Sequence, residues 1–418
     1  MPVVVLIGML DVQGLEYAWL RDRLGSLGAE VVLVDTGVLD EPGVVPDVPR
    51  EDVLQAGGTD PATLSATAAD LPGGPGRDTA LASMARGAAA TAGELFRAGR
   101  LHGVLAIGGG GNATVAAEAM RALPVGVPKL MISSMASGDV SPYIGGADLT
   151  LMYSVVDIAG LNRISSRVLA NAADAIAGMA AGYAAGRPPA TADGPLVGAT
   201  LAGVTGPGVS AARELLGILG YEVLVFRATG AGGRPYEAMA AGGLLTAALD
   251  ATLVELSTGL LAGTAPEARR LEAAVRHGVP QVVSPGGLDM ARFRGIPPDH
   301  LAGRRVHTRH PSVTLVRTTP AESAELGRRV AAALRDATAP TAVHLPLRGL
   351  STLGAPGGPF HDPAADAALF GALRDGLSGS RVEIHEMDTD LNDPAFGRAM
   401  ADHLHTLLTG FPVRAAAS

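Results

Sequence analysis

The chain has 418 residues, of which 47% are hydrophobic and 17% charged, so it can bury a large core and long disordered stretches are not expected. A formal net charge of −9 argues against a nucleic-acid-binding protein, because such a protein needs a basic surface. An aromatic content of only 3% also leaves few side chains on which bases could stack. Cysteine is absent, which excludes disulfides, thiolate nucleophiles and cysteine-ligated metals.

Membrane insertion and secretion are not expected. No apolar run reaches the roughly 18 residues of a transmembrane helix. The first ten residues, "MPVVVLIGML", lack the basic segment of a signal peptide and predict a first strand instead. We therefore expect a soluble, cytoplasmic protein.

Apolar runs alternate with helical patterns along the first half of the chain. Helices are expected over Leu15–Gly28 and from Asp157 to about Tyr183, whereas residues 41–80 show weak periodicity. Runs that are apolar at every position predict strands of a parallel sheet that is covered on both faces. These strands are expected at Val3–Gly8, Glu30–Gly37, Gly103–Gly109, Lys129–Ser134 and Leu149–Ser154.

The pattern restarts after a Pro-rich stretch, which predicts a linker at residues 187–194 between lobes 1–186 and 195–418. "LGAEVVLV" (Leu27–Val34) is echoed by "LGYEVLVF" (Leu219–Phe226), which indicates similar lobes. The predicted fold is α/β: two Rossmann-like, doubly wound parallel-sheet lobes with a cleft between them. Later strands are expected at "ATLVEL", "QVVSPGG", "RVHTR", "VTLVRT", "AVHLPL" and "RVEIHEM".

Four consecutive glycines follow the third expected strand, in "AIGGGGNATVAAEAM" (Ala106–Met120). Ligands of such sheets bind where strands end and helices begin, and glycine lets backbone amides approach an anion. The loop lacks the Gly-Lys-Ser/Thr of a Walker motif. The alternative is that the glycines only permit close packing of helix on strand. The candidate residues are Gly108, Gly109, Gly110, Gly111, Asn112, Ala113 and Thr114.

Polar residues also follow the neighbouring strands. Ser133, Ser134, Ser137 and Gly138 form a second loop that can converge on the same ligand, unless they only form turns and a cap at Asp139. The ends of the first and second strands supply three further candidates, which are Asp11, Gln13 and Asp35. Asp35 can bind a ribose, or it can have a role in a turn or a helix cap.

Four loops of the second lobe predict a small anionic ligand, and Arg234 is its expected charge partner. His307 and His310 lie in a strand-like segment, so we expect no metal site there. His310 can serve as an acid or base or have a structural role, and His361 can reach the cleft. Asp362 and Pro363 are expected to begin a helix. The second-ligand candidates are Thr205, Gly206, Thr229, Gly230, Gly232, Gly233, Arg234, Ser257, Thr258, Ser284, Gly286, Gly287 and His310.

A long motif, "LPVGVPKLMISSMASGDVSPYIGGADLTLMYSVVDIAGLNRISSRVLANAADAIAGM" (Leu123–Met179), resembles an uncharacterised family related to the N-terminal ATP-binding region of the plant tobamovirus-resistance protein. The resemblance continues through "YEVLVFRATGAGGRPYEAM", "PQVVSPGGLDM" and "PLRGLSTLGAPGGPFHDPAADAALF". It implies two Rossmann-like lobes, nucleotide binding by Gly108–Thr114 and Ser133–Gly138, and a homodimer. The chain departs from the family at Gln13, where a lysine is common, and at "GRDTA" (Gly76–Ala80), where Asp-Arg-Gly is usual.

Three functions remain open. The first is an ATP-dependent enzyme acting on a small acid, with catalytic residues unknown and Mg²⁺ only as the companion of the triphosphate. The second is a regulatory or interaction protein that binds a nucleotide without catalysis. The third is a hydrolase or lyase acting on a phosphate-bearing metabolite.

Overall fold

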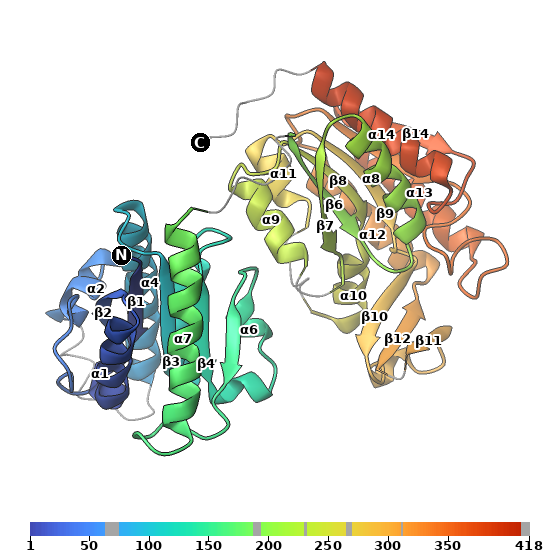
Figure 1. Ribbon diagram of the computed structural model, residues 1–418. Coiled ribbons are helices and arrows are strands. Elements are labelled where there is room, and N and C mark those ends of the chain that lie inside the picture. The colour runs from blue at the N-terminus through green and yellow to red at the C-terminus, as the bar shows by residue number, and fades with distance from the viewer. Residues whose placement is uncertain (63–74, 187–193, 230–231, 265–269, 311, 411–418) are drawn as a thin grey trace. The chain divides into compact units, whose positions relative to one another are not determined.

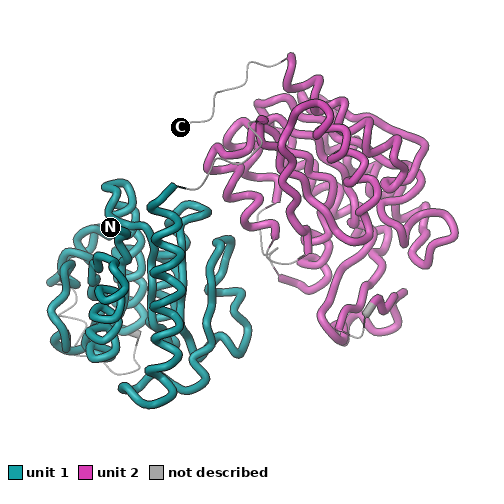
Figure 2. The backbone as a smooth tube through the Cα atoms, in the orientation of Figure 1, with its two compact units in different colours: residues 1–189 teal, residues 190–418 magenta. Residues whose placement is uncertain are grey.

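The chain forms two compact units, residues 1–189 and residues 190–418 (Figure 2). The computed structural model describes residues 1–62, 75–186, 194–229, 232–264, 270–310 and 312–410. Within these ranges, no helix combines the length and the apolar character that crossing a bilayer requires.

Unit 1 is built on a five-stranded parallel sheet in the order β2-β1-β3-β4-β5 (Figure 1). The strands coincide closely with the five apolar runs of the first half, so the expected parallel sheet is confirmed. Their bounds are β1 (Val3–Gly8), β2 (Glu30–Asp35), β3 (Gly103–Gly108), β4 (Lys129–Ser133) and β5 (Thr150–Tyr153).

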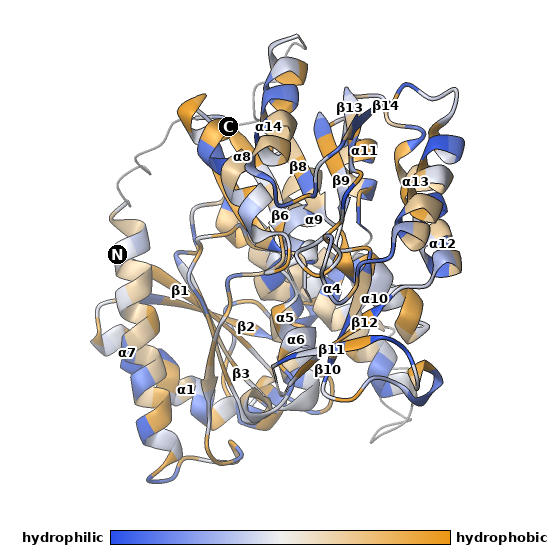
Figure 3. Ribbon diagram, turned by 90° about the vertical axis from the view of Figure 1, so that its right-hand side faces the viewer, coloured by the Kyte–Doolittle hydropathy of each residue, from blue (hydrophilic) through white to orange (hydrophobic). Residues whose placement is uncertain are grey.

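Helices cover both faces of this sheet because successive strand residues point to opposite sides. Val4 and Leu6 pack with α1 (Leu10–Ser26) and α7 (Ser165–Ala184). Val3 and Val5 pack on the other face. That face is covered by α2 (Arg50–Ala56), α4 (Pro75–Arg97) and α5 (Gly110–Arg121). Figure 3 colours α7 in alternating orange and blue, as expected for a helix with one buried face.

Helix α7 begins later than its sequence pattern predicts. We expected it from Asp157, but the helix starts at Ser165. Asn162 Oδ1 accepts hydrogen bonds of 2.9 Å from the amides of Ile164 and Ser165, which satisfies donors of the first turn. Residues 157–163 therefore form a loop at the carboxyl ends of the strands. The short elements η2 (Ser134–Ser137) and α6 (Ser141–Ile144) precede β5.

Unit 2 contains a six-stranded parallel sheet in the order β14-β13-β9-β8-β6-β7. Its strands are β6 (Leu196–Leu201), β7 (Glu222–Arg227), β8 (Ala247–Thr252), β9 (Gln281–Gly286), β13 (Thr341–Pro346) and β14 (Glu383–Met387). The two-lobed α/β fold is thus confirmed.

Helices again cover both faces of the sheet in unit 2. One face packs against α8 (Gly206–Ile218) and α14 (Pro394–Thr409). The other packs against α9 (Gly233–Ala241), α10 (Val254–Ala262), α11 (Glu272–His277), α12 (Pro320–Leu334) and α13 (Pro363–Leu377). The predicted start of α13 is confirmed, because Pro363 is its first residue and Asp362 Oδ1 accepts from the Ala365 amide over 3.1 Å.

Two details of unit 2 differ from expectation. The strand expected at "ATLVEL" (Ala251–Leu256) is wrong: β8 ends at Thr252, and Val254 begins α10. Periodicity cannot distinguish a strand from a helix over a run as short as these six residues. The runs around His307 and Leu315 do form strands, but they lie in a separate antiparallel sheet. This sheet has the order β10-β12-β11, comprising β10 (Met290–Arg294), β11 (Val306–His310) and β12 (Val313–Arg317).

Candidate functional site

The strand order of unit 1 places its ligand crevice between β1 and β3. A parallel sheet of this order binds ligands where the chain turns to opposite sides of two adjacent strands, at their carboxyl ends. The last paired residues of β1 and β3 are Ile7 and Ala106, beyond which the strands separate. The loops leading into α1 and α5 begin at this point.

Tyr17 of α1 fills the gap where the two strands separate. Its hydroxyl donates to the carbonyl of Ile7 over 2.7 Å and accepts from the amide of Ile107 over 2.9 Å. The ring is fully buried, and burial raises the pKa of Tyr17, so the hydroxyl keeps its proton. Gly8 is required beside it, since a Cβ there would lie 2.0 Å from the ring. The floor of the crevice is thereby fixed.

The four glycines after β3 serve two different purposes. A Cβ at Gly108 would lie 2.7 Å from Cα of Ala113, so this glycine permits α5 to pack closely on β3. At Gly109 and Gly110 a Cβ would meet no described atom within 4 Å. At Gly111 the nearest atom would be Cδ1 of Leu81, at 3.0 Å. The packing explanation thus accounts for Gly108, whereas Gly109 and Gly110 border open space.

The N-terminus of α5 opens onto this space without a side-chain cap. Amides of a first helical turn have no partner within the helix, and they carry a partial positive charge. Asn112 is 5% exposed, and its Nδ2 donates to the carbonyl of Ile107 and to Gln13 Oε1. Its Oδ1 is buried and has no hydrogen-bond partner among the described residues. A ligand at this helix end would find both open amides and an unpartnered polar atom.

These groups line a cavity of about 1240 Å³. Six of the residues expected from sequence border it: Gln13, Gly109, Gly110, Gly111, Asn112 and Thr114. Gln13 has a non-helical backbone (φ −122°, ψ 29°) that kinks α1. Its Nε2 donates to the carbonyl of Ile158 over 3.3 Å, which holds the loop before α7 at the rim.

Helix α4 adds charged residues that are not among the candidate residues expected from the sequence. Arg77 and Arg86 line the cavity, and Nε of Arg77 is buried without a described hydrogen-bond partner. Arg86 donates to Ser83 Oγ over 3.0 Å. The weak periodicity before Ala80 gave no indication that a helix begins there, although Arg77 lies in "GRDTA", where the chain departs from the family it resembles. The sequence also gave no indication of four further residues that line the cavity, namely Asp78, Glu118, Asp157 and Ile158.

The serine-rich loop after β4 does not border this cavity. Gly108 and Ser133 are paired in register, so the two loops follow neighbouring strands as expected. However, the hydroxyls are used locally: Ser133 Oγ accepts from the Met135 amide over 3.1 Å, and Ser137 Oγ donates to the Ser134 carbonyl over 3.1 Å. Gly138 ends the turn that they form.

Asp11 and Asp35 also have structural partners. Asp11 Oδ2 accepts from the amide of Leu39 over 2.7 Å, which ties the loop after β2 to α1. Asp35 Oδ1 accepts from the amides of Leu10 and Gly37, at 3.2 and 2.8 Å. Burial raises the pKa of Asp35, and these hydrogen bonds oppose the rise. The turn role of Asp35, one of its two alternatives, is therefore filled in the structure, and both residues lie outside the cavity lining.

In unit 2, hydroxyl groups occupy the equivalent separation between β6 and β8. The last paired residues before it are Ala199 and Leu249. Beyond them, Thr252 Oγ1 lies 2.8 Å from Thr205 Oγ1 and donates to the Thr200 carbonyl over 3.1 Å. Thr205, a candidate for the second ligand, is thus fully buried and hydrogen-bonded within the unit.

Ser257 and Thr258 do not lie in a loop as expected. Because β8 ends early, both are within α10, where each hydroxyl donates to the Val254 carbonyl, over 2.9 and 2.8 Å. Ser257 also donates to the Met290 carbonyl, and Thr258 accepts from the Arg292 amide over 3.0 Å. They connect α10 to β10.

The remaining second-ligand candidates are dispersed over several elements. Gly232 and Gly286 allow close packing, since a Cβ would lie 2.0 and 2.2 Å from backbone carbonyl oxygens. Ser284 is buried, and its hydroxyl has no described partner. Gly230 and the side chain of His310 lie outside the described residues. The others are Gly206 at the start of α8, Thr229 after β7, Gly233 and Arg234 in the first turn of α9, and Gly287 after β9 with φ +75°.

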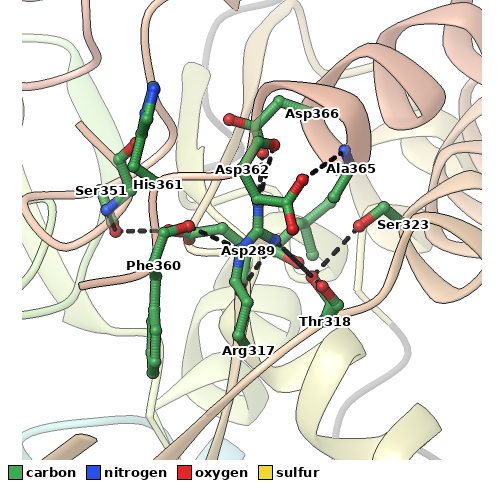
Figure 4. A network of polar contacts seen from close by, with 12 residues as sticks. Asp289, Arg317, Thr318, Ser323, Ser351, Phe360, His361, Asp362, Ala365 and Asp366 are labelled. Atoms are coloured by element: carbon green, nitrogen blue, oxygen red, sulfur yellow. Dashed lines mark hydrogen bonds and ion pairs between the residues drawn. The ribbon is translucent and has the colours of Figure 1, made fainter. Parts of the chain in front are cut away.

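Two buried arginines organise charge networks in unit 2. Arg317 donates through Nε to the Phe360 carbonyl over 2.8 Å and pairs with Asp366 Oδ1 at 2.7 Å (Figure 4). Its Nη1 donates to the backbone carbonyl of Asp289, whose carboxylate accepts from Ser351 Oγ over 2.6 Å. Burial raises the pKa of Asp289 to about 6. His361 lies at the edge of this network, where its Nδ1 donates to the Gly354 carbonyl over 3.2 Å.

The second network surrounds Arg270, whose side chain is fully buried. Asp250 accepts from its Nη2 with both carboxylate oxygens, at 2.5 and 2.7 Å, and Glu255 pairs with Nη1. Glu237 lies 3.4 Å from Nε. Burial raises the pKa of Glu255 to about 7 and also raises that of Glu237. Arg270 and Arg317 are both paired with carboxylates of the protein, so neither network offers a free cationic group to an anionic ligand.

Comparisons with known proteins identify one family. The N-terminal domain model of the uncharacterised protein family UPF0261 matches residues 2–185, and the C-terminal domain model matches residues 194–408. A UPF0261 protein of Clostridium tetani is 39% identical over 408 residues, which are 97% of this chain and 98% of that protein. A UPF0261 protein of Rhizobium meliloti is 40% identical over 404 residues, 96% and 97% of the two chains.

A plant protein is also similar over part of its length. The tomato ToMV resistance protein Tm-1(GCR237) is 39% identical over 309 residues, which cover 72% of this chain and 41% of the tomato protein. The resemblance found in the sequence motifs is therefore confirmed. Since the two domain models together match nearly all of both units, the chain belongs to the uncharacterised protein family UPF0261.

Proposed function

We propose that unit 1 binds a nucleotide, with ATP as the first candidate, and that the phosphates lie at the N-terminus of α5. One observation carries the proposal: this helix end, bordered by the uncovered Gly109 and Gly110, opens into a cavity of about 1240 Å³ that two arginines also line. The sequence motifs add support, because they resemble a family related to an ATP-binding region.

The charges of the cavity suit a phosphate group. A helix N-terminus favours an anion by up to about 2 kcal/mol in a partly buried site. Arg77 and Arg86 add positive charge and can bind phosphate oxygens with two parallel hydrogen bonds. The buried Oδ1 of Asn112 would receive the partner that it lacks if a ligand hydroxyl or a bound water lay beside it.

The size and the remaining lining of the cavity suit a nucleoside. Pockets for small ligands usually span about 300–1,000 Å³, so this cavity has room for a nucleoside triphosphate. An apolar wall can cover a base or a ribose. It consists of Met9, Leu81, Ala82, Ala85, Ala89 and Ile158.

Mg²⁺ would accompany a bound triphosphate. Asp78, Glu118 and Asp157 line the same cavity, and carboxylate oxygens are the ligands that this ion prefers, directly or through water. We therefore expect Mg²⁺ to strengthen ATP binding and to have little effect on the binding of adenosine.

Binding of a second, anionic metabolite and its reaction with the nucleotide stay predictions. Thr205, Ser257 and Thr258 have protein partners, which does not favour them as ligands. The homodimer and the cytoplasmic location also stay predictions, which sedimentation of the full chain and cell fractionation can check.

Isothermal titration of the full chain with ATP tests the proposal. Gly110→Val places a branched side chain in the open space at the helix end, and should weaken ATP binding at least tenfold, about 1.4 kcal/mol. Gly178→Val is the matched control, because Gly178 is an exposed glycine of α7 at which a Cβ also meets no atom within 4 Å.

Competition separates the alternative functions. Displacement of ATP by sugar phosphates or coenzyme A would indicate a phosphate-bearing metabolite as the natural ligand, and phosphate release with a metabolite would indicate an enzyme. Absence of saturable ATP binding by the wild-type chain, or equal affinity of Gly110→Val, would overturn the proposal.

A further inference from the structure

Three histidines from different elements meet beside the edge strand of unit 2. His344 lies on β13 and His385 on β14, and the two are paired in register. His403 lies on α14, which packs over this part of the sheet. One ring nitrogen from each residue lies within 4.8 Å of the others. The fold thus brings together three imidazoles that are far apart in sequence.

The rings are held in place by close packing. His344 stacks on His385 with 5.1 Å between centroids and 17° between planes, and Phe396 packs edge-to-face on His344 with 6.1 Å between ring centroids. Nε2 of His344 is 2.8 Å from Nδ1 of His403. Only one of these two nitrogens can carry the shared proton, so one of the facing atoms offers a lone pair.

Glu383 orients two of the rings from outside the cluster. Its Oε2 lies 3.0 Å from Nε2 of His385 and 3.4 Å from Nε2 of His403. For His403 this leaves Nδ1 directed toward His344. A carboxylate on the outer nitrogen of a histidine is the usual support of a metal-binding imidazole, since it fixes the ring and makes the inner nitrogen more basic.

The cluster is accessible from solvent on one side. The exposed fraction of the side chain is 44% for His385 and 14% for His403, whereas His344 is 3% exposed. An ion can therefore enter past His385, while His344 provides a buried anchor.

We propose that His344, His385 and His403 bind a divalent transition-metal ion of the Zn²⁺ type, with one coordination position left for water. Imidazole nitrogens select Zn²⁺, Co²⁺, Ni²⁺ or Cu²⁺ over Mg²⁺ and Ca²⁺, which prefer oxygen ligands. Three protein ligands and an open position form the arrangement of zinc sites that keep a bound water.

Binding requires the three nitrogens, which now lie within 4.8 Å of one another, to reach similar separations. Zn–N bonds of about 2.0–2.1 Å in a tetrahedral site place ligand nitrogens about 3.3 Å apart. The 2.8 Å contact between His344 and His403 would open by roughly half an ångström. The bound ion would link β13, the edge strand β14 and α14.

Zinc titration of the EDTA-treated full chain, purified without a histidine tag, tests the proposal. We expect one equivalent of zinc to bind saturably, and a rise in the melting temperature of unit 2 by about 5–10 °C at a free zinc concentration of a hundred times the dissociation constant. Bound Co²⁺ should show the intense visible bands of a tetrahedral site, and excess Mg²⁺ should not displace either ion.

His385→Gln and His403→Gln should each abolish this stoichiometric binding. His405→Gln is the matched control, because His405 lies on α14 near His403 but bonds Tyr221 over 2.9 Å. His385 is partly exposed at the sheet edge, so its variant should fold, which circular dichroism verifies. Equal zinc affinity of wild type and His385→Gln, or no saturable binding by wild type, would overturn the proposal. Either result would leave ATP binding by unit 1 unaffected.

Discussion

Nδ2 of Asn112 donates a hydrogen bond to Oε1 of Gln13 over 3.2 Å, which joins the first turn of α5 to the kink of α1. Gln13 in turn donates to the carbonyl of Ile158. Three segments that are distant in sequence are thus fastened around one cavity. The NH₂ groups of both side chains donate to protein atoms, whereas Oδ1 of Asn112 has no described partner.

Asn112→Asp should impair the nucleotide site. The carboxylate would repel phosphate and would lose the donors that hold Gln13 and Ile107, so we expect ATP binding to weaken at least tenfold, about 1.4 kcal/mol. Asn392→Asp is the control: its Oδ1 is also buried without a described partner, but it lies in unit 2. Titration calorimetry should show normal ATP affinity for Asn392→Asp. An equal loss in both variants would contradict a local role of Asn112.

Arg86→Gln should weaken ATP binding by about 10–100-fold, because a hydrogen bond to a charged group contributes about 1.5–3 kcal/mol. Adenosine, which has no phosphate, should bind the variant and the wild type equally. Arg97→Gln is the control, since Arg97 is exposed at the C-terminal end of α4 and does not line the cavity. If adenosine and ATP lost the same affinity, Arg86 would act on the shape of the cavity and not on phosphate.

Arg270→Met should destabilise unit 2 by about 3–5 kcal/mol. Removing the guanidinium leaves Asp250 and Glu255 buried without their cation, and breaking a buried pair costs far more than breaking an exposed one. Arg276→Met is the comparison, because Arg276 pairs with Glu272 on the surface and should change the free energy of unfolding by less than about 1 kcal/mol. Urea denaturation measures both. Similar values for the two variants would show that the Arg270 network does not stabilise the fold.

Asp289 should make the stability of unit 2 depend on pH. The native chain retains this proton up to about pH 6, whereas the unfolded chain releases it near pH 3.8. Between these values the native state binds more protons, so the contribution of Asp289 to the free energy of unfolding falls as the pH rises, and it is constant above about pH 6. The loss is at most about 3 kcal/mol.

The variant Asp289→Asn has no carboxyl group at this position, so this change in proton binding is absent. The difference in the free energy of unfolding, variant minus wild type, should therefore increase between about pH 4 and about pH 6 and then level off. A difference for Asp289→Asn that did not vary with pH would contradict the raised pKa.

Much of the fold was predictable because its strands are buried on both faces. The continuous apolar runs at Val3–Gly8 and Gly103–Gly108 predicted parallel strands, and both are confirmed. Asp362 and Pro363 predicted a helix start because each satisfies a local requirement of the first turn. The run at "ATLVEL" was wrongly assigned because six residues are too few for periodicity to separate the end of a buried strand from the start of a buried helix.

The cavity was only partly predictable. The glycines indicated a close approach of the backbone, but whether Gly108 or Gly110 faces a ligand depends on the packing of Ala113. The arginines of α4 are brought to the site by tertiary structure, from a segment with little periodicity. The cluster of His344, His385 and His403 has no spacing motif, because its members reach one place from two strands and a helix.

The repeated strand order has a consequence for redesign of this chain. Beyond the last paired residues, unit 1 bridges its first and third strands with one phenol from a helix, Tyr17, and unit 2 bridges the corresponding strands with the hydroxyls of Thr200, Thr205 and Thr252. Transplanting the glycine loop onto β8 would therefore not create a second anion pocket, since threonine hydroxyls occupy the gap. A redesign would first have to replace those threonines with one side chain that reaches the gap from a helix, as Tyr17 does in unit 1.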